Sequence, residues 1–294
     1  MGTPFQAVVD TLADREVITR SLLFSIYGRL RGLDRTVKAG TYRLPRGARF
    51  GEVHAVLAQG RVVTFPMLFP EGLTIGMMIG RIADAAGADS ASVTRFLEDE
   101  DLHLRWEVPG PGLEGYLFPD TYRFAQGVGT ERVVSAMIAR YHNYWTPERR
   151  ERLVESGMTE RGAVTLASII QAEAGNVSEM RTISSVFHNR LRIGMRLQAD
   201  PTIHYALPPG YRPRLLYAAM DSVADHPYNT YTHAGLPPGP ICAPGADALD
   251  AALNPADTDY LYFVAGGGNQ HVFSRSLEEH NAAIRRIRAA PNGG

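Results

Sequence analysis

One apolar helix that ends on a carboxylate constrains this chain more than any other feature. The segment Leu166–Glu179 reads LASIIQAEAGNVSE, and its Leu, Ala and Ile residues recur with a helical period. At about 100° per residue, Glu173 lies about 20° from Leu166 and about 40° from Ile169, whereas Gln171 points about 200° away from Glu173. The pattern therefore places a single glutamate on the apolar face of a helix.

A carboxyl group among apolar neighbours loses its hydration, which raises its pKa and keeps it protonated near neutral pH. Because a general acid must carry a proton, Glu173 is the candidate catalytic acid. The alternative is structural, with Glu173 paired to a buried cation. Arg190 is the candidate partner, since it falls on the apolar side of the next predicted helix, about 178–193. Spacing alone leaves both interpretations open.

No second carboxylate is an obvious partner for Glu173, although glycosidases usually need two. Glu179 pairs with Asn176 in the pattern of a capping box. Asp200 precedes Pro201 and reads as the N-cap of a short helix. A lone acid is still sufficient when the reaction needs no activated water.

The N-terminal part predicts small strand–helix units. Three segments share a turn glycine followed by a helical apolar period, and strand-like runs precede the second and third of them. The segments are Gly2–Leu12, Gly47–Leu57 and Gly72–Ile82, and the runs are Thr41–Leu44 and Val62–Phe69. Generic α+β packing explains this pattern about as well as a true repeat does.

The C-terminal part predicts helices, two irregular segments and a hairpin. Val108–Phe124 reads as a loop rich in rings and acids, and Pro208–Pro244 is a long segment rich in Pro, Gly and Tyr. Two strand-like runs, Tyr260–Ala265 and His271–Ser274, flank Gly266–Gly268 and favour a β-hairpin. A final helix is expected over Leu277–Ala289.

Composition excludes several classes of protein. A formal net charge of −1 gives no basic field for nucleic acid. The single cysteine, Cys242, allows neither an internal disulfide nor a zinc site built from cysteines, so we expect no metal and no cofactor. No run approaches the roughly 18 apolar residues of a membrane span, and no signal peptide is visible. We therefore expect the chain itself to be soluble.

Several blocks strongly resemble the endolytic murein transglycosylase family (YceG-like, MltG). They are LEGYLFPDTY, LASIIQAEAG, SVFHNRLRIGMRLQADPTIHYAL, YNTYTHAGLPPGPICAPG and DYLYFVA followed by HVFS, and the match covers nearly the whole chain. The resemblance implies an α+β fold, with LysM-like strand–helix units followed by a mainly helical catalytic domain that carries a C-terminal β-hairpin. It divides the chain into an N-terminal α+β region (1–61), a LysM-like module (62–107) and a YceG-like catalytic domain (108–294).

The resemblance implies an enzyme that cleaves peptidoglycan strands between N-acetylmuramic acid (MurNAc) and N-acetylglucosamine (GlcNAc). Such a lytic transglycosylase leaves 1,6-anhydro-MurNAc ends and thereby terminates or trims nascent strands. By position the catalytic glutamate is Glu173. Many members have a second glutamate where this chain has Gln171, which indicates that the first place is not catalytic. The substrate's C6 hydroxyl is the nucleophile, so one carboxyl group suffices.

Twelve further matched positions are expected to line the sugar cleft. Amides suit hydroxyl and acetamido groups, and tyrosine rings stack on sugar faces, although each residue could instead have a packing role. The twelve are Glu114, Tyr116, Asp120, Asn189, Arg190, Gln198, Asp200, Thr202, Tyr228, Asn229, Thr230 and Tyr231. The segments Val108–Phe124 and Tyr228–Gly239 are expected to approach the Glu173 helix from two sides and form one cleft.

The family also implies partners and a location. These are peptidoglycan glycan strands, candidate peptidoglycan synthases, and the extracytoplasmic side of the cytoplasmic membrane. Members normally carry one transmembrane helix before the first LysM-like unit, and this sequence shows none, so we expect a truncated start. Two alternatives remain. One is a water-using muramidase with Asp200 or Glu114 as second carboxylate, and the other is a non-enzymatic peptidoglycan-binding protein.

Overall fold

The computed structural model describes residues 4–38, 40–99, 101–208 and 217–289. The first residues of the expected Gly2–Leu12 segment and positions 209–216 of the irregular segment lie outside this part. The chain forms two compact units, described separately below. Unit 1 holds Met1–Met67, Arg81–Ser90 and Thr121–Val133, and unit 2 holds Leu68–Gly80, Ala91–Asp120 and Val134–Gly294. The three-part division of the chain stays a prediction.

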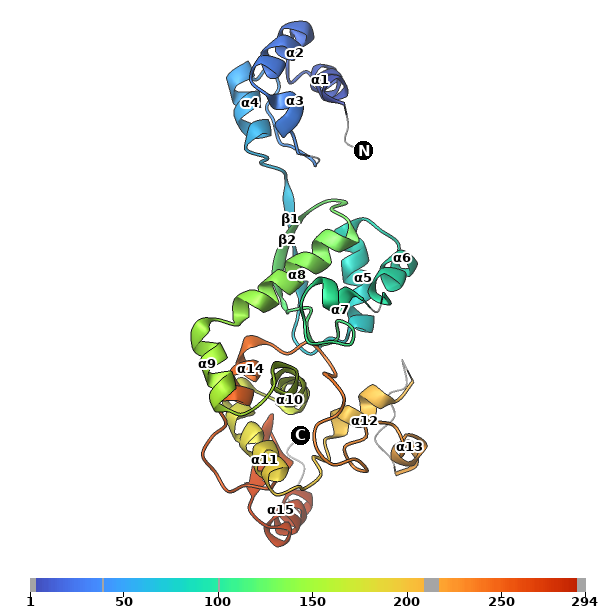
Figure 1. Ribbon diagram of the computed structural model, residues 1–294, viewed down its shortest axis with the longest axis vertical. Helices are drawn as coiled ribbons and strands as arrows, with labels where there is room; N and C mark the ends of the chain where they lie inside the picture. The colour runs from blue at the N-terminus through green and yellow to red at the C-terminus, as the bar shows by residue number, and fades with distance from the viewer. Residues whose placement is uncertain (1–3, 39, 100, 209–216, 290–294) are drawn as a thin grey trace. The chain divides into compact units, whose positions relative to one another are not determined.

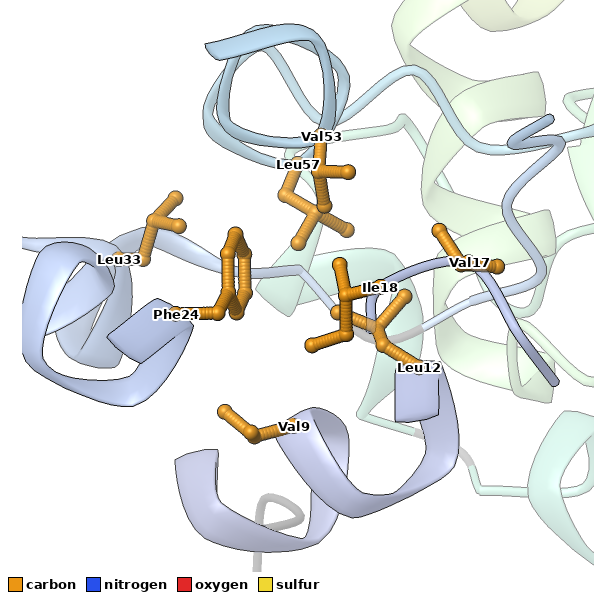
Figure 2. Packing of buried hydrophobic residues seen from close by; sticks show 8 residues of the cluster. All are labelled: Val9, Leu12, Val17, Ile18, Phe24, Leu33, Val53 and Leu57. Carbon is orange, nitrogen blue, oxygen red and sulfur yellow. The ribbon is translucent and has the colours of Figure 1, made fainter. Parts of the chain in front are cut away.

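Four helices of unit 1 pack around one apolar cluster, shown in Figure 2. They are α1 (Phe5–Asp14), α2 (Ser21–Leu30), α3 (Leu33–Thr36) and α4 (Phe50–Ala58). The cluster consists of Val9, Leu12, Val17, Ile18, Phe24, Leu33, Val53 and Leu57. The helices expected after the first two turn glycines are confirmed as α1 and α4. The strand expected over Thr41–Leu44 is wrong, because only an isolated bridge joins Tyr42 to Val62. LysM-like character stays a prediction.

Two short strands from distant parts of the sequence pair as β1 (Thr64–Phe69) and β2 (Asp120–Ala125). The Arg123 guanidinium supports the pair by donating to the Thr64 hydroxyl and the Thr64 carbonyl, each at 3.1 Å. The intervening and following helices are α5 (Ile75–Ala86), α6 (Ser90–Leu97), α7 (Leu102–Arg105), α8 (Thr130–Tyr144) and α9 (Pro147–Glu155).

Helix α10 (Glu160–Glu173) forms the centre of unit 2, where it packs against α11 (Met180–Arg192), α12 (Asp200–Ala206) and α14 (Ala246–Leu253) (Figure 1). The Thr159 hydroxyl caps its start by accepting from the Gly162 N–H at 3.0 Å. Every residue from 163 to 170 is buried. Ser168 remains in this apolar stretch because its hydroxyl accepts from the Ile241 N–H at 3.0 Å.

The predicted C-terminal hairpin is confirmed. Strands β3 (Tyr262–Gly267) and β4 (Gln270–Ser274) are antiparallel, with Phe263 opposite Phe273. Helix α15 (Leu277–Ala289) packs on both strands, and η1 (Val177–Glu179) and α13 (Tyr217–Ser222) complete the elements. The fold is α+β and mainly helical, as expected. None of the described helices has the length and apolar character needed to cross a membrane.

Candidate active site

Glu173 is the last residue of α10 and is partly buried. The chain turns extended at Ala174, whose N–H still closes the helix on the Ile170 carbonyl at 2.9 Å. The buried helix therefore delivers one carboxyl group at its end, on the side that the apolar period predicted. The helix begins at Glu160, before the quoted segment.

Burial is the main cause that raises the pKa of Glu173, to about 8. The negative charge of Asp200 raises this pKa further. Two features act in the opposite direction, the positive charge of Arg190 and the backbone N–H of Asp200, which donates to the Glu173 carboxyl group. The net result is a carboxyl group that is mostly protonated at neutral pH.

Arg190 does not form the ion pair with Glu173 that the structural alternative required; among the described residues no salt bridge joins them. Its guanidinium is buried, with Nε donating to the Leu261 carbonyl at 2.7 Å and Nη1 to the Leu197 carbonyl at 2.5 Å. The group also lies 5.4 Å from the centre of the Tyr262 ring. Arg190 therefore holds two backbone segments together and acts on Glu173 only through its charge.

The sequence pattern predicted Asp200 as the N-cap of its helix, and this prediction is wrong. Ala199 occupies that position, and Asp200 is the first residue of α12. Its carboxylate instead accepts a hydrogen bond from the Tyr231 hydroxyl. A contact across 31 residues thus overrides the local capping preference, and it brings Asp200 and Tyr231 to Glu173.

A buried hydroxyl pair fixes this arrangement. The Thr230 hydroxyl accepts from the Ala199 N–H at 3.0 Å and lies 2.9 Å from the Thr202 hydroxyl. The carbonyl of Thr230 accepts from the Gln198 N–H at 3.1 Å. Next to this pair, the buried Asn229 side chain accepts from the Tyr231 N–H at 2.9 Å and donates to the Val223 carbonyl at 3.0 Å. These contacts join the 229–231 loop to the start of α12.

The side-chain amides of Asn189 and Asn176 also form hydrogen bonds with backbone groups. Asn189 Nδ2 donates to the carbonyls of Thr258 and Tyr260 at 2.7 and 3.0 Å. Asn176 accepts from the Glu179 N–H at 3.2 Å, which confirms half of the predicted capping box. The other half differs from the prediction, because the Glu179 carboxylate reaches back to the Asn176 side-chain amide at 3.3 Å and not to its backbone N–H. The same carboxylate also accepts from the His271 N–H and ring at 2.9 Å each. Glu179 thereby holds the hairpin against the start of α11.

The two ring-rich segments meet in a pocket of about 350 Å³ that includes Glu114, Tyr116, Arg161 and Tyr228 among its lining. Both oxygens of Glu114 lie 3.2 Å from the Ile75 nitrogen, and burial raises its pKa to about 7. The expectation of one cleft is therefore confirmed only in part. The segments do meet on α10, but at Arg161 in its first turn, and Glu173 is not among the lining residues.

The two remaining candidates lie in the Val108–Phe124 segment, whose last residues form β2 and not the loop that the sequence predicted. The Tyr116 hydroxyl donates to the Pro109 carbonyl at 2.8 Å, and its ring is buried. Asp120 accepts from Arg140 Nε at 2.7 Å. Arg161 donates to the Pro238 carbonyl and lines the pocket, yet no motif in the sequence marks it.

Gln171 faces away from Glu173, as the helical period predicted. Its Oε1 accepts from the Gly245 N–H at 3.0 Å, at the start of α14. A neutral amide that accepts a backbone hydrogen bond has a structural role. Within the described residues, no group of three or more His, Cys, Asp or Glu side chains is placed to hold a metal ion.

The comparisons with known proteins agree with one another. The model of the YceG-like family matches residues 1–286. An endolytic murein transglycosylase of Bacillus subtilis is 33% identical over 307 residues, which cover 99% of this chain and 84% of that protein. One of Streptococcus pneumoniae is 28% identical over 95% of this chain, which spans only 57% of that longer protein.

A solved structure shows the same fold. It is the crystal structure of a putative YceG-like protein from Listeria monocytogenes, with a TM-score of 0.67 and 32% sequence identity, covering 95% of both chains. Together with the family match over almost the whole sequence, this likeness shows that the chain belongs to the YceG-like family.

Proposed function

We propose that this chain is an endolytic murein transglycosylase that cleaves the MurNAc–GlcNAc bond of peptidoglycan strands and leaves 1,6-anhydro-MurNAc ends. The relatives with this name support the activity. The observation that carries it is the Glu173 carboxyl group, which ends a buried helix and keeps its proton at neutral pH. A group that is both protonated and reachable from outside suits a general acid.

In this mechanism Glu173 first donates its proton to the glycosidic oxygen, and GlcNAc leaves with a free 4-hydroxyl group. The C6 hydroxyl of MurNAc then forms a bond to the anomeric carbon as the Glu173 carboxylate takes its proton. The ring closes as the 1,6-anhydro sugar, and Glu173 is protonated again. No water is consumed, so the reaction requires no second carboxylate as base.

Asp200 supports both states of Glu173. Its carboxylate charge favours the protonated acid before cleavage, whereas its backbone N–H favours the carboxylate that must accept the C6 hydroxyl proton. Because the Tyr231 hydroxyl binds the Asp200 carboxylate, both groups are held beside Glu173. We assign these two residues the task of positioning Glu173 and of contacting the sugar.

The surroundings of their side chains separate the other candidates into two proposed groups. Gln198 is exposed, and Glu114 and Tyr228 line the pocket beside Arg161, so we assign these three to sugar contacts. The rest make hydrogen bonds within the protein, and we assign them to positioning the loops of the site. They are Tyr116, Asp120, Asn189, Arg190, Thr202, Asn229 and Thr230.

The muramidase alternative needs a second carboxylate that acts as a base. Glu114 lines a pocket that does not include Glu173 and, with a pKa of about 7, is half protonated near neutral pH. Asp200 is held by Tyr231 at the side of Glu173. Digesting purified peptidoglycan in ¹⁸O-labelled water separates the two reactions by mass spectrometry. Anhydro ends without label support the proposal, and labelled reducing ends contradict it.

The proposed substrate also determines the place of action. Peptidoglycan lies outside the cytoplasmic membrane, so we place the active chain in the cell envelope, on the extracytoplasmic side. Peptidoglycan synthases supply the strands that such an enzyme would trim, and we propose them as neighbours. Fractionating cells and probing the chain from outside with a protease would test this location.

A further inference from the structure

Helix α2 carries a stripe of large apolar side chains that nothing in the described structure covers. Leu22, Leu23, Ile26 and Leu30 are exposed by 73, 48, 52 and 82%. No other described helix exposes more than one large hydrophobic side chain. Single exposed apolar residues are ordinary, whereas a contiguous stripe marks an interaction surface.

The stripe lies on the side of α2 that faces away from the core. Phe24, Ser25 and Gly28 form the buried face, and Figure 2 shows the Phe24 ring pointing into the apolar cluster. Gly28 allows close packing, because a Cβ there would lie 2.4 Å from the Phe5 ring. The buried face fixes the rotation of α2 about its axis, so the stripe on the opposite side points away from the core.

Arginines border the stripe on both edges. At about 100° per residue, Arg29 lies about 20° before Leu22, and Arg20 and Arg31 lie about 60 to 80° beyond Leu23. All three are exposed and form no salt bridge within the described residues, and α2 itself contains no acidic residue. Such edges let guanidinium groups reach phosphates while the apolar side chains enter a lipid layer.

We propose that α2 docks unit 1 on the surface of an anionic lipid bilayer, with Leu22, Ile26 and Leu30 inserted and the three arginines at headgroup phosphates. The helix is about 15 Å long and lies parallel to the surface, so it binds reversibly and does not span the bilayer. This contact is independent of the proposed cleavage reaction.

Charge distinguishes a bilayer from a second copy of the chain. The charged side chains along both edges of the stripe are all arginine, so pairing α2 with α2 would place arginines opposite arginines. An anionic headgroup layer instead offers negative charge along both edges. The lipid layer also covers the exposed side chains of the stripe without needing a groove of matching shape.

The test is flotation of the full chain with vesicles that contain phosphatidylglycerol, and with vesicles of phosphatidylcholine alone. We expect binding to the first and little binding to the second. Ile26→Ser/Leu30→Ser should lower the partition coefficient about tenfold or more, because two inserted side chains are lost. Val154→Ser/Leu277→Ser removes two apolar side chains of similar exposure and only slightly smaller total size from α9 and α15, and it should bind like the wild type.

Arg29→Gln/Arg31→Gln should weaken binding severalfold and reduce its salt dependence. Circular dichroism checks that each variant is folded. Absence of wild-type binding to anionic vesicles overturns the proposal, and so does an equal loss in the control pair. A dimer that Ile26→Ser/Leu30→Ser dissolves, without any flotation, would identify the stripe as a protein interface and would also overturn it.

Discussion

The backbone N–H of Asp200 donates to the carboxyl group of Glu173, while the Asp200 side chain accepts from the Tyr231 hydroxyl. One residue therefore influences Glu173 with two opposite signs. The N–H stabilises the ionised form of Glu173, and the carboxylate stabilises the protonated form. A group that must give up a proton and regain it within one reaction needs both influences.

Asp200→Asn should move the alkaline limb of kcat/KM to lower pH. Removing the neighbouring negative charge lowers the pKa of Glu173 from about 8, while the backbone N–H stays in place. A pH–rate profile for the release of anhydro ends measures this shift. Asp225→Asn changes an exposed acid outside the site and serves as the matched control. A limb that stays in place or moves to higher pH would contradict the role given to Asp200.

Gln171→Glu should not restore activity to Glu173→Gln. Position 171 faces the Gly245 N–H on the other side of α10, so a carboxylate there does not reach the Glu173 position. Gln171→Ala should destabilise the fold by about 1–3 kcal/mol, because the N–H of Gly245 loses its acceptor. Urea unfolding measures the second effect. Recovery of turnover in the double variant would show that position 171 can supply the acid.

Arg190→Met should destabilise the protein by about 2–4 kcal/mol, because two backbone carbonyls lose their donor inside the protein. Glu173→Gln should leave stability unchanged or higher at neutral pH, since it removes a buried ionisable group without orphaning a donor. A lysine can donate to one of the two carbonyls, so the loss of stability in Arg190→Lys should lie between those of Glu173→Gln and Arg190→Met. Equal destabilisation by Glu173→Gln and Arg190→Met in urea would favour the structural ion pair instead.

Stability should fall as the pH rises from 5 to 8.5. The pKa values of Glu114 and Glu173 in the folded chain are about 7 and 8, above the ordinary value of 4.5. Between pH 4.5 and about 8, the folded state holds more protons than the unfolded state, so raising the pH favours unfolding. Each unit of pKa difference between the folded and the unfolded state changes the free energy of unfolding by about 1.4 kcal/mol. Glu114→Gln and Glu173→Gln should each flatten the dependence of unfolding free energy on pH, and an unchanged slope in both would disprove the raised values.

Local periodicity was enough to predict the elements that build the site. The 3.6-residue period placed Glu173 and Gln171 on opposite sides of α10, and alternation around glycines predicted the hairpin. These predictions succeed because each depends on neighbours within a few residues. The resemblance to a family then identified which polar positions to consider, but it could not separate buried from exposed ones.

Contacts between distant residues could not be predicted in this way. Asp200 has the local pattern of an N-cap, yet Tyr231 binds its carboxylate from 31 residues away. Glu179 has the sequence position of a capping-box partner of Asn176, yet its carboxylate also binds His271, which lies 92 residues away in sequence. The exposure of the apolar stripe of α2 could not be predicted from the sequence either, because a helical period does not tell which of two apolar faces the rest of the chain covers.

The most direct test is the Glu173→Gln variant with purified peptidoglycan strands in ¹⁸O-labelled water. The wild type should release 1,6-anhydro-MurNAc ends that carry no label. The variant should keep its melting temperature and lose about 10²–10⁴-fold or more of the rate, because one group serves as both acid and base. Near-normal turnover by the folded variant, or labelled reducing ends from the wild type, would contradict the assignment of Glu173 as the acid of a lytic transglycosylase.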